Sequence, residues 1–349
     1  MAERVLVISL QGVGNLIMAT PVIEGLARAG REVHVAVSTR AVADLIAASP
    51  FVSGVTPLDE AAPYVTRAGR AAGLGLRLRK ERFAVSVTTY PNGRSAAILA
   101  LVAGARVRVG FGTRAARRAS AYTARLTPAP GLHDVEQNLR LLDALDVRRP
   151  TPIAPHVPLS DDDRAFAGSF FAKVGRLDAG RPIAALHPGG AATGLFRRWP
   201  RENFEELALR LRRDLGLGVV LVGDASERTM LESIALAAGD GVAVAAGPPL
   251  GHIAAVIAKC SVFVGNDSGP LHIAAALGVP VVGIYGPTSE VRTAPYGSGH
   301  SVLTASVACR PCYAFGERFS CEFDQVMCLE LIDVDVVLEA VKAKLGQAV

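Results

Sequence analysis

The sequence predicts an α/β protein with two successive parallel sheets, and three observations lead to this fold class. Short, almost continuously apolar runs such as 5–10 are typical of strands that are buried on both faces of a sheet. These runs alternate with helical segments, as repeating βα units do. The alternation pauses at a stretch rich in proline, 148–158, which has the composition of a stiff, extended linker. We therefore expect two doubly wound domains, 1–158 and 159–349.

In the first domain each predicted strand is followed by a predicted helix. We expect strands at 5–10, 33–37, 54–57, 83–88 and 106–110 and helices at 16–29, 41–47, 64–80, 95–103 and 133–145. Gly30 is a typical stop for the first helix. The last of these helices opens with a polar group, which we expect to cap it and to face solvent: His133, Asp134, Glu136 and Asn138.

The second domain repeats the pattern. We expect strands at 183–186, 219–222, 242–246, 262–265 and 281–285, and helices at 202–215, 251–259, 271–277 and 333–345, with one more opening near 223–228. Two acidic groups could suggest a metal, namely 161–163 and the pair Asp333 and Asp335. Both precede predicted helices, so capping and the helix dipole explain them better.

Bulk properties exclude several classes of protein. No apolar run approaches the ~20 residues that span a bilayer, and residues 1–10 lack the apolar region of a signal peptide. We therefore expect a cytoplasmic protein. The segment 104–133 has no acid but several arginines, which indicates either a solvated loop or a surface for anionic lipid or a phosphorylated acceptor. Nucleic acid is not expected as a partner, because no nucleic-acid-binding motif appears in the sequence. The arginines of this segment are Arg106, Arg108, Arg114, Arg117, Arg118 and Arg125.

The loop after the first strand begins Gly12-Val-Gly14, which by itself is a weak signal for a dinucleotide. Ile17 stands where the third glycine of that fingerprint would be, and no acid ends the second strand at 33–37. A nicotinamide-dependent dehydrogenase is therefore disfavoured. The glycines suit a loop whose backbone lies close to a partner molecule.

A stronger signal lies at 262–288, which has the order strand, loop, helix and strand. The helix begins at Pro270, just beyond a parallel strand, so that its unpaired N–H groups point toward a place where phosphates bind. Gly269 allows a ligand to approach the backbone, and His272 lies one turn into the helix. The alternative is an ordinary βαβ turn that binds nothing. With two sheets in succession, a cleft between them would suit two substrates.

Four sets of residues occur together in an order and spacing that resembles glycosyltransferase family 9, the ADP-heptose:lipopolysaccharide heptosyltransferases. They are Gly12-x-Gly-Asn15 with Thr20-Pro21, His187-Pro-Gly with Arg197-Arg-Trp-Pro200, Gly223-x-x-x-Glu227, and Asn266-Asp-Ser-Gly-Pro-x-His272. The resemblance covers essentially the whole chain. It implies a GT-B fold, with two Rossmann-like domains that bind the acceptor in the N-terminal half and the nucleotide sugar in the C-terminal half. In such a fold the last helix is expected to pack back on the N-terminal domain.

The resemblance also implies an activity, which is inverting transfer of heptose from ADP-heptose to a lipopolysaccharide core or a related acceptor. No metal or other cofactor is needed for this catalysis. The enzyme would lie in the cytoplasm or at the inner face of the cytoplasmic membrane, in peripheral contact with anionic lipid. Two alternatives keep the fold, namely transfer to a protein or small-molecule acceptor, and binding of a nucleotide sugar without transfer.

Positions in this sequence that match the family's motifs would form the donor site. Asp267, with Ser268 and Gly269, would lie beside the diphosphate and the sugar, and His272 belongs to the same motif. Arg197 would pair with the phosphates and Glu227 with the ribose hydroxyls. The loop that holds Gly189 and Thr193 would also contact the phosphates.

Asn15 is a departure from the lipopolysaccharide enzymes, which have an aspartate here that is thought to take the acceptor's proton. An amide cannot act as a general base at neutral pH. Either another carboxylate takes this role, with Asp134 and Glu136 as unranked candidates, or Asn15 only orients the acceptor. Among the three residues matched to the catalytic centre, Asn15, Arg197 and Asp267, we therefore expect Asn15 to contact the acceptor or the sugar.

The five cysteines fall into two groups. Cys260 precedes an apolar strand and is expected in the core. Cys309, Cys312, Cys321 and Cys328 lie within twenty residues of one another, and the first two form a Cys-x-x-Cys pair. In a cytosolic protein, such a set suits either a structural zinc or iron ion held by four thiolates, or four reduced thiols that pack an irregular loop.

Overall fold

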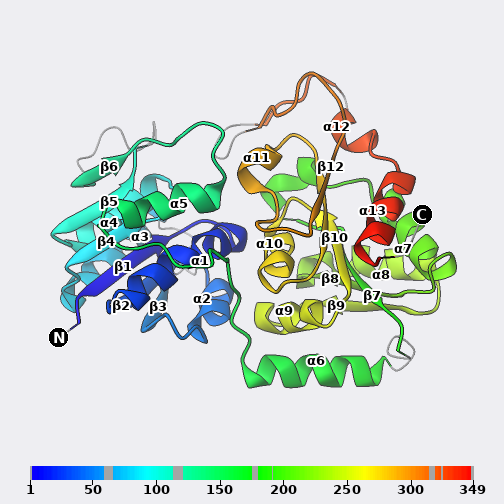
Figure 1. Ribbon diagram of the computed structural model, residues 1–349, viewed down its shortest axis with the longest axis horizontal. Coiled ribbons are helices and arrows are strands. Elements are labelled where there is room, and N and C mark those ends of the chain that lie inside the picture. The colour runs from blue at the N-terminus through cyan, green and yellow to red at the C-terminus, as the bar shows by residue number, and fades with distance from the viewer. Residues whose placement is uncertain are drawn as a thin grey trace. The chain divides into compact units, whose positions relative to one another are not determined.

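The computed structural model describes residues 2–58, 66–112, 121–174, 180–190, 192–313, 319–323 and 325–346, with the backbone alone for 192 and 193. The chain is divided into two compact units, Met1–Pro158 and Leu159–Val349 (Figure 1). Each unit has one six-stranded sheet, and all strand pairs are parallel. The predicted α/β class, with two doubly wound parallel sheets, is confirmed.

The sheet of the first unit has the strand order β3-β2-β1-β4-β5-β6. Its strands are β1 (Arg4–Ser9), β2 (Glu32–Val37), β3 (Gly54–Pro57), β4 (Val85–Thr88), β5 (Val107–Phe111) and β6 (Ala124–Leu126). Its helices are α1 (Val13–Arg28), α2 (Arg40–Ala47), α3 (Arg67–Leu78), the 3₁₀ turn η1 (Arg79–Glu81), α4 (Arg94–Ala103) and α5 (Asp134–Asp143). The short edge strand β6 was not predicted, because three residues are too few for a periodic signal.

The second sheet has the order β12-β11-β10-β7-β8-β9. Its strands are β7 (Ile183–His187), β8 (Gly218–Gly223), β9 (Val242–Ala246), β10 (Val262–Asn266), β11 (Val281–Tyr285) and β12 (Ser301–Thr304). The helices are α6 (Asp161–Lys173), α7 (Arg201–Arg213), α8 (Arg228–Ala238), α9 (Leu250–Ala258), α10 (Gly269–Ala276), α11 (Glu290–Thr293), α12 (Met327–Glu330) and α13 (Val334–Lys344), with 3₁₀ turns η3 (Ala192–Arg197) and η4 (Ala225–Glu227). In both sheets the first strand of the unit pairs with its second and its fourth strand, so the chain reverses its winding direction beside that first strand.

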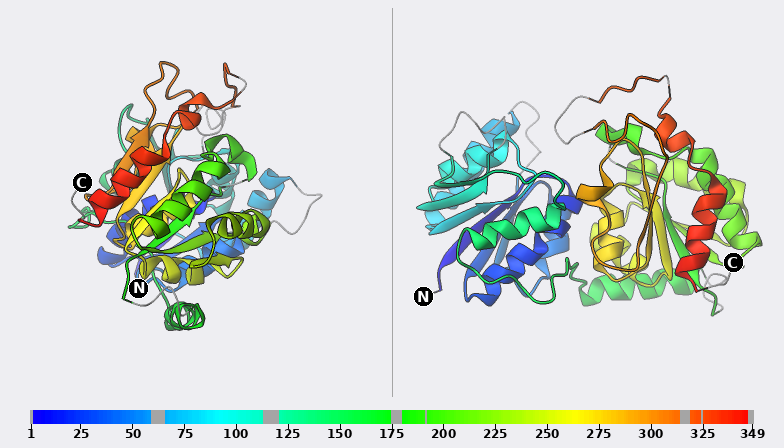
Figure 2. Two further views of the ribbon diagram at one scale, coloured as in Figure 1. Left: turned by 90° about the vertical axis from the view of Figure 1, so that its right-hand side faces the viewer. Right: turned by 45° about the horizontal axis from the view of Figure 1, so that its top comes forward.

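Helices cover both faces of each sheet. In the first unit, α1 packs with α5, and α3 packs with α4 over a separate core that includes Leu6 and Ile8 (Figure 1). In the second unit, α7 packs with α8 and α13, and α9 packs with α10 and α6. Figure 2 shows the second sheet between the yellow helices α9 and α10 on one side and the red helix α13 on the other. Because both faces are covered, β7, β8, β10 and β11 are buried along their whole lengths, which explains their continuous apolar sequences.

Helix α1 begins earlier than the sequence predicts. Gly12 is its N-cap, so Asn15 lies in the first helical turn rather than in a loop. Pro21 lies inside this helix and cannot donate to the carbonyl of Ile17. The hydroxyl of Thr20 donates to that carbonyl instead, at 2.7 Å, and accepts the backbone N–H of His156 at 2.9 Å. The Thr20-Pro21 pair is thereby accommodated without an unpaired carbonyl.

One further expectation was wrong. The polar group that opens α5 does not face solvent, since Asp134 is 1% exposed and Asn138 is fully buried. Only its capping part holds, because His133 accepts the N–H of Val135 at 3.1 Å. The last helix, α13, packs against α7, β10 and β11 of its own unit, and Arg210 of α7 binds Asp335 at 2.6 Å. Asp333 is the N-cap of α13 but makes no side-chain capping bond.

Candidate functional site

Polar side chains gather where β8, β7 and β10 end in the second sheet. The strands are neighbours, and His187 at the end of β7 is in register with Gly265 of β10. This is the point where the order of connection reverses, and open α/β sheets bind ligands there, outside the carboxyl ends of the strands. The segments that follow these strands carry most of the residues that the sequence predicts for the donor site.

Asn266, the last residue of β10, holds these segments together. Its side chain is 1% exposed. Its Oδ1 accepts the backbone N–H of Trp199 at 2.9 Å, and its Nδ2 donates to the carbonyls of Pro188 and Gly189 at 2.9 and 3.0 Å. One buried amide thus fixes the loop after β7 and the segment before α7. Sequence analysis treated Asn266 as a loop residue and missed this role.

Trp199 anchors the arginines that precede it. The indole is 1% exposed and packs on Phe204, with 5.0 Å between ring centroids. Its Nε1 donates to the carbonyl of Ile332 at 2.9 Å. The Trp-Pro part of the motif is therefore structural, and its effect is to fix where Arg197 and Arg198 leave the backbone.

Arg197 lies against Asp267. Its Nη1 is 3.2 Å from the carbonyl oxygen of Asp267 and 3.6 Å from the carboxylate Oδ2. Its Nε is buried without a partner in the part of the chain that the structure describes. Burial, followed by the charge of Asp267, raises the pKa of the neighbouring Tyr285 well above its usual value. A guanidinium that is oriented by one carboxylate and keeps spare N–H donors is suited to bind a phosphate.

Helix α10 begins beside this ion pair. Ser268 is its N-cap, Pro270 lies in the first turn as predicted, and that turn has no acid. The positive end of the helix dipole and the N–H groups of the first turn therefore favour an anion. His272 is buried in the same helix, one turn from Ser268.

Glu227 is the most heavily bonded residue of the site. It is 6% exposed. It accepts the backbone N–H of Gly190 at 2.7 Å and that of Asp224 at 3.0 Å, and it lies 3.4 Å from Arg198 and 3.6 Å from His187. Burial raises the pKa of Glu227, but the His187 side chain and the two N–H groups outweigh it and lower the pKa to about 2. Glu227 is therefore a carboxylate at neutral pH.

Glycine is required where backbone approaches this carboxylate. A Cβ on Gly189 would lie 1.9 Å from Oε1 of Glu227, and one on Gly223 would lie 2.7 Å from Oε2. The two glycines of the motifs are thus explained by packing against Glu227. The structure brings Gly189, Arg197, Glu227, Asp267 and Ser268 together, while the side chain of Thr193 lies outside the described residues.

Comparison with known proteins identifies the family. The family model for glycosyltransferase family 9 (heptosyltransferase) matches residues 72–322. The chain belongs to this family. It is 34% identical to lipopolysaccharide heptosyltransferase 2 of Escherichia coli K12 over 152 residues, which are 42% of each protein. The chain spans less than half the length of the first curated relatives that it matches.

Solved structures match over the full length. The ADP-heptose lipopolysaccharide heptosyltransferase II of Escherichia coli has a TM-score of 0.76 at 25% identity, with 99% of both chains covered. A family 9 glycosyltransferase from Veillonella parvula has a TM-score of 0.81 at 21% identity, with 99% of this chain and 98% of that chain covered. The expected GT-B fold of this family 9 protein is therefore confirmed.

Three residues of this candidate site were given no role from the sequence of this family 9 protein. His187 and Arg198 were part of recognised motifs but were given no role, and both lie beside Glu227. Asn266 is the third. The sequence signal that could have revealed Asn266 is its place as a polar residue at the end of an apolar strand. A polar side chain buried there must pair its polar atoms with the loops around it.

In the first unit, the three residues predicted to act on the acceptor, Asn15, Asp134 and Glu136, have different environments. Asn15 is half-buried in the first turn of α1. Glu136 binds Arg149 at 3.3 Å. Asp134 is buried at the start of α5, close to Asn138, whose Nδ2 donates to its carbonyl at 2.9 Å.

The four clustered cysteines are free thiols in a segment attached to the second sheet. Cys312 donates its backbone N–H to Pro287 at 3.1 Å, just beyond β11. Burial, with a smaller contribution from the nearby thiols of Cys312 and Cys309, raises the pKa of Cys328 to about 11, so these sulfurs lie within electrostatic reach of one another. No group of three or more His, Cys, Asp or Glu side chains within the described residues is arranged to hold a metal ion. The metal therefore stays a prediction.

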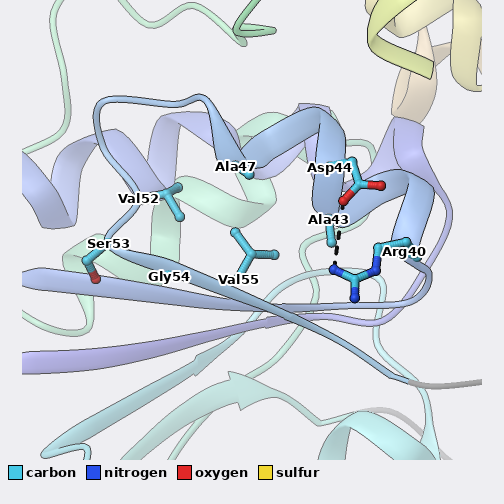
Figure 3. A pocket seen from close by; sticks show the side chains of 8 residues that line it. All are labelled: Arg40, Ala43, Asp44, Ala47, Val52, Ser53, Gly54 and Val55. Atoms are coloured by element: carbon cyan, nitrogen blue, oxygen red, sulfur yellow. Dashed lines mark ion pairs between the residues drawn. The ribbon is translucent and has the colours of Figure 1, made fainter. Parts of the chain in front are cut away.

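One surface hollow lies elsewhere. It has a volume of about 170 Å³ and lies between α2 and the edge strand β3 of the first unit (Figure 3). Arg40 and Asp44 pair at 3.9 Å at one end of it. None of the predicted site residues lines this hollow, so it does not belong to the donor region. None of the helices in the described part of the chain is both long and apolar enough to cross a bilayer.

Proposed function

We propose that the protein is a metal-independent, inverting glycosyltransferase that moves heptose from ADP-heptose to a lipopolysaccharide core or a related acceptor. The observation that carries this proposal is the convergence of Arg197, Asp267 and the N-terminus of α10 at the reversal point of the second sheet. Its support from relatives is the similarity to a lipopolysaccharide heptosyltransferase of Escherichia coli.

The reaction needs charge stabilisation at the donor's diphosphate. An acceptor hydroxyl oxygen attacks the anomeric carbon, the bond from that carbon to the diphosphate oxygen breaks, and ADP leaves with the bonding electrons. Attack from the face opposite the leaving group inverts the anomeric configuration. Arg197 and the first-turn N–H groups of α10 would bind the growing negative charge, which is the electrostatic task that a metal ion performs in other enzymes.

The remaining donor residues would hold the nucleotide. Glu227, charged at neutral pH, would accept hydrogen bonds from the ribose hydroxyls. The loop of Gly189 and Thr193 would contact the phosphates, with Gly269 and His272 close to the sugar. Asp267 would orient Arg197 and lie beside the sugar.

The acceptor's proton needs a destination other than Asn15. A carboxylate would accept the proton as the bond to the anomeric carbon forms, and Asp134 and Glu136 stay the two candidates. Asp134 is buried, and Glu136 is bound by Arg149. Asn15 would orient the acceptor hydroxyl or the sugar through its amide.

A second candidate function is binding of a nucleotide sugar without transfer, which the amide at Asn15 favours. Calorimetry and a transfer assay separate the two. We expect ADP-heptose to stabilise the protein against heat more than UDP- or GDP-sugars do, because only ligands of the folded state stabilise it. Release of ADP that depends on an acceptor would support transfer. Binding without any turnover would support the second candidate, and no binding of any nucleotide sugar would contradict both.

Contact with an anionic membrane is part of the proposal. Of the arginines predicted for this surface, Arg106 and Arg125 are exposed, Arg108 is bound to the carbonyls of Ala105 and Ala121, and Arg114, Arg117 and Arg118 lie outside the described residues. Vesicles with phosphatidylglycerol should retain the protein at low salt and release it near 1 M salt, where the Debye length falls to about 3 Å. Equal retention on neutral vesicles would argue against this contact.

We also propose that Cys309, Cys312, Cys321 and Cys328 bind a structural zinc or iron ion. Their spacing, four cysteines within twenty residues that open with a Cys-x-x-Cys pair, supports it. Elemental analysis of the purified protein should find about one equivalent of zinc or iron, and replacement of Cys312 and Cys328 by serine should remove it. Protein purified without metal that melts at the same temperature as the metal-loaded protein would contradict this proposal.

A further inference from the structure

His187 is buried beneath the donor residues, and its place there suggests a role of its own. It ends β7, the central strand at the reversal point, and is 3% exposed. Its Nδ1 lies 3.1 Å from the hydroxyl oxygen of Ser268, which follows β10. Its Nε2 lies 3.6 Å from Oε2 of Glu227, which follows β8. One imidazole therefore links the segments that leave three neighbouring strands.

The chemistry of the two partners fixes the direction of these interactions. A carboxylate can only accept, so the proton of a neutral His187 belongs on Nε2, facing Glu227. Nδ1 then carries a lone pair and accepts the hydroxyl proton of Ser268. With its proton used in this way, Ser268 Oγ presents lone pairs to any further partner and can only accept.

The N-cap geometry agrees with this assignment. A serine at an N-cap commonly uses its oxygen to accept an N–H from the first helical turn. Ser268 makes no such capping bond, although it is the N-cap of α10. Its hydroxyl is turned to His187 instead, so the N–H groups of that turn are not capped by it.

We propose that His187 is a positioning residue that makes Ser268 a hydrogen-bond acceptor for a hydroxyl of the donor sugar and holds Glu227 toward the ribose. This inference rests on the proposed donor site. It assigns the two arms of the imidazole to two parts of the ligand. The Nδ1 arm, through Ser268, recognises the sugar, and the Nε2 arm, through Glu227, recognises the nucleoside.

Two substitutions separate the arms. In His187→Gln the longer amide reaches the Nε2 position and keeps a donor for Glu227, but the partner of Ser268 is lost. In His187→Asn the shorter amide presents an oxygen near the Nδ1 position and keeps Ser268 oriented, but the Glu227 arm is lost. Calorimetric titration of each variant with ADP-heptose and with ADP compares the affinity for the whole donor with the affinity for its nucleotide alone.

We expect His187→Gln to weaken ADP-heptose binding by about tenfold and to leave ADP binding near the wild-type value, since one hydrogen bond to the sugar is lost. His187→Asn should weaken the binding of ADP-heptose and the binding of ADP by a similar factor. His252→Gln is the matched control, because His252 is a half-buried histidine of the same unit that pairs with a carboxylate, Asp162, at 3.0 Å. It should change neither affinity. His187→Gln that binds both ligands like the wild type would overturn the inference.

A measurement on the unmodified protein does not depend on whether the variants fold. Imidazole ¹⁵N shifts of His187 should show a protonated Nε2 and an unprotonated Nδ1 in the free protein at neutral pH. A proton on Nδ1 alone would overturn the inference, since Ser268 would then keep its own proton for a ligand. If the wild type binds neither ADP nor ADP-heptose, the proposed function fails, while the tautomer still decides whether His187 sets the polarity of Ser268.

Discussion

The two units share one strand order but use the reversal point of their sheets differently. Each has a fully buried asparagine that clamps a loop there. Asn138 accepts the N–H of Tyr90 at 2.7 Å and donates to its carbonyl at 3.1 Å, and Asn266 clamps Trp199, Pro188 and Gly189 in the same manner. The second clamp is joined to the charged groups of the candidate donor site, because Asp267 follows Asn266 directly and Glu227 follows the end of β8.

The helices that start at the two reversal points differ too. In the first unit, α1 and α4 begin after glycine N-caps and have no acid in their first turns. In the second unit, α10 begins after Ser268, beside an arginine and a carboxylate. The same fold therefore offers glycine-capped helix starts in one unit and a charged edge in the other, which suits an acceptor and a diphosphate respectively. The fold places the sites, and the side chains at the strand ends decide their chemistry.

The largest effect that tests this difference is on the rate. Arg197→Ala should lower kcat for transfer by about 10²–10³-fold, as loss of one preorganised donor to a transition-state charge does. Arg201→Ala is the matched control, since Arg201 is an exposed arginine four residues away that pairs with Glu205 at 3.3 Å. Steady-state kinetics with ADP-heptose measures both. Equal rates for the two variants would contradict a role for Arg197 in stabilising the charge of the leaving group.

Glu227 should make the second unit sensitive to acid. The pKa of Glu227 is about 2 in the folded protein against an ordinary value of 4.5, so its contribution to stability is complete above pH 4.5 and disappears as the pH falls toward 2. The contribution amounts to about 3 kcal/mol at most. Urea unfolding of wild type and Glu227→Gln should show a shallower fall below pH 4.5 for the variant. Parallel curves would mean that Glu227 is not held as an ion.

Paired substitutions of the two asparagines sharpen the comparison. Asn138→Ala and Asn266→Ala should each lower the free energy of unfolding by about 1–3 kcal/mol, because buried backbone groups lose their partners. Only Asn266→Ala should also weaken ADP-heptose binding, since its clamp positions the arginine and the glycine loop. Denaturant unfolding and calorimetric titration report the two effects. If Asn138→Ala weakened ADP-heptose binding equally, the proposal that the donor binds to the second unit would fail.

The smallest effect concerns Asn15. If its amide orients the acceptor, Asn15→Ala should raise the acceptor KM by about tenfold, the effect of one hydrogen bond, and leave the donor KM unchanged. Asn15→Asp would place a carboxylate where the lipopolysaccharide enzymes have one, and should increase kcat if proton transfer limits the rate. Unchanged acceptor kinetics in Asn15→Ala would leave the amide without a role.

Much of the fold is readable from the sequence, because the central strands are buried on both faces and appear as apolar runs. Strands β3, β9 and β11 were predicted at their observed bounds. The misses are short or irregular, such as the edge strands β6 and β12 and the 3₁₀ turn that carries Arg197. Three or four residues give no period, and their structure depends on a neighbouring strand or on a buried tryptophan far along the chain.

The candidate donor site could be predicted only as far as it lies in motifs. Asp267, Ser268 and Glu227 were assigned from motifs that resemble those of family 9, and their roles stay predictions. The roles of His187 and Asn266 were missed, since each depends on contacts between segments about 80 residues apart, as in the bond from Asn266 to Pro188. The start of α1 was placed too late, because glycine and asparagine indicate a loop and only the observed backbone shows that Gly12 is the cap.

The most direct test of the account is a crystal structure of the protein with ADP. We expect the β-phosphate within hydrogen-bond distance of the Arg197 guanidinium and of the backbone N–H groups that open α10, and the ribose hydroxyls on Glu227. A nucleotide bound away from the carboxyl ends of β7 and β10, or a diphosphate that leaves Arg197 paired only with Asp267, would contradict it.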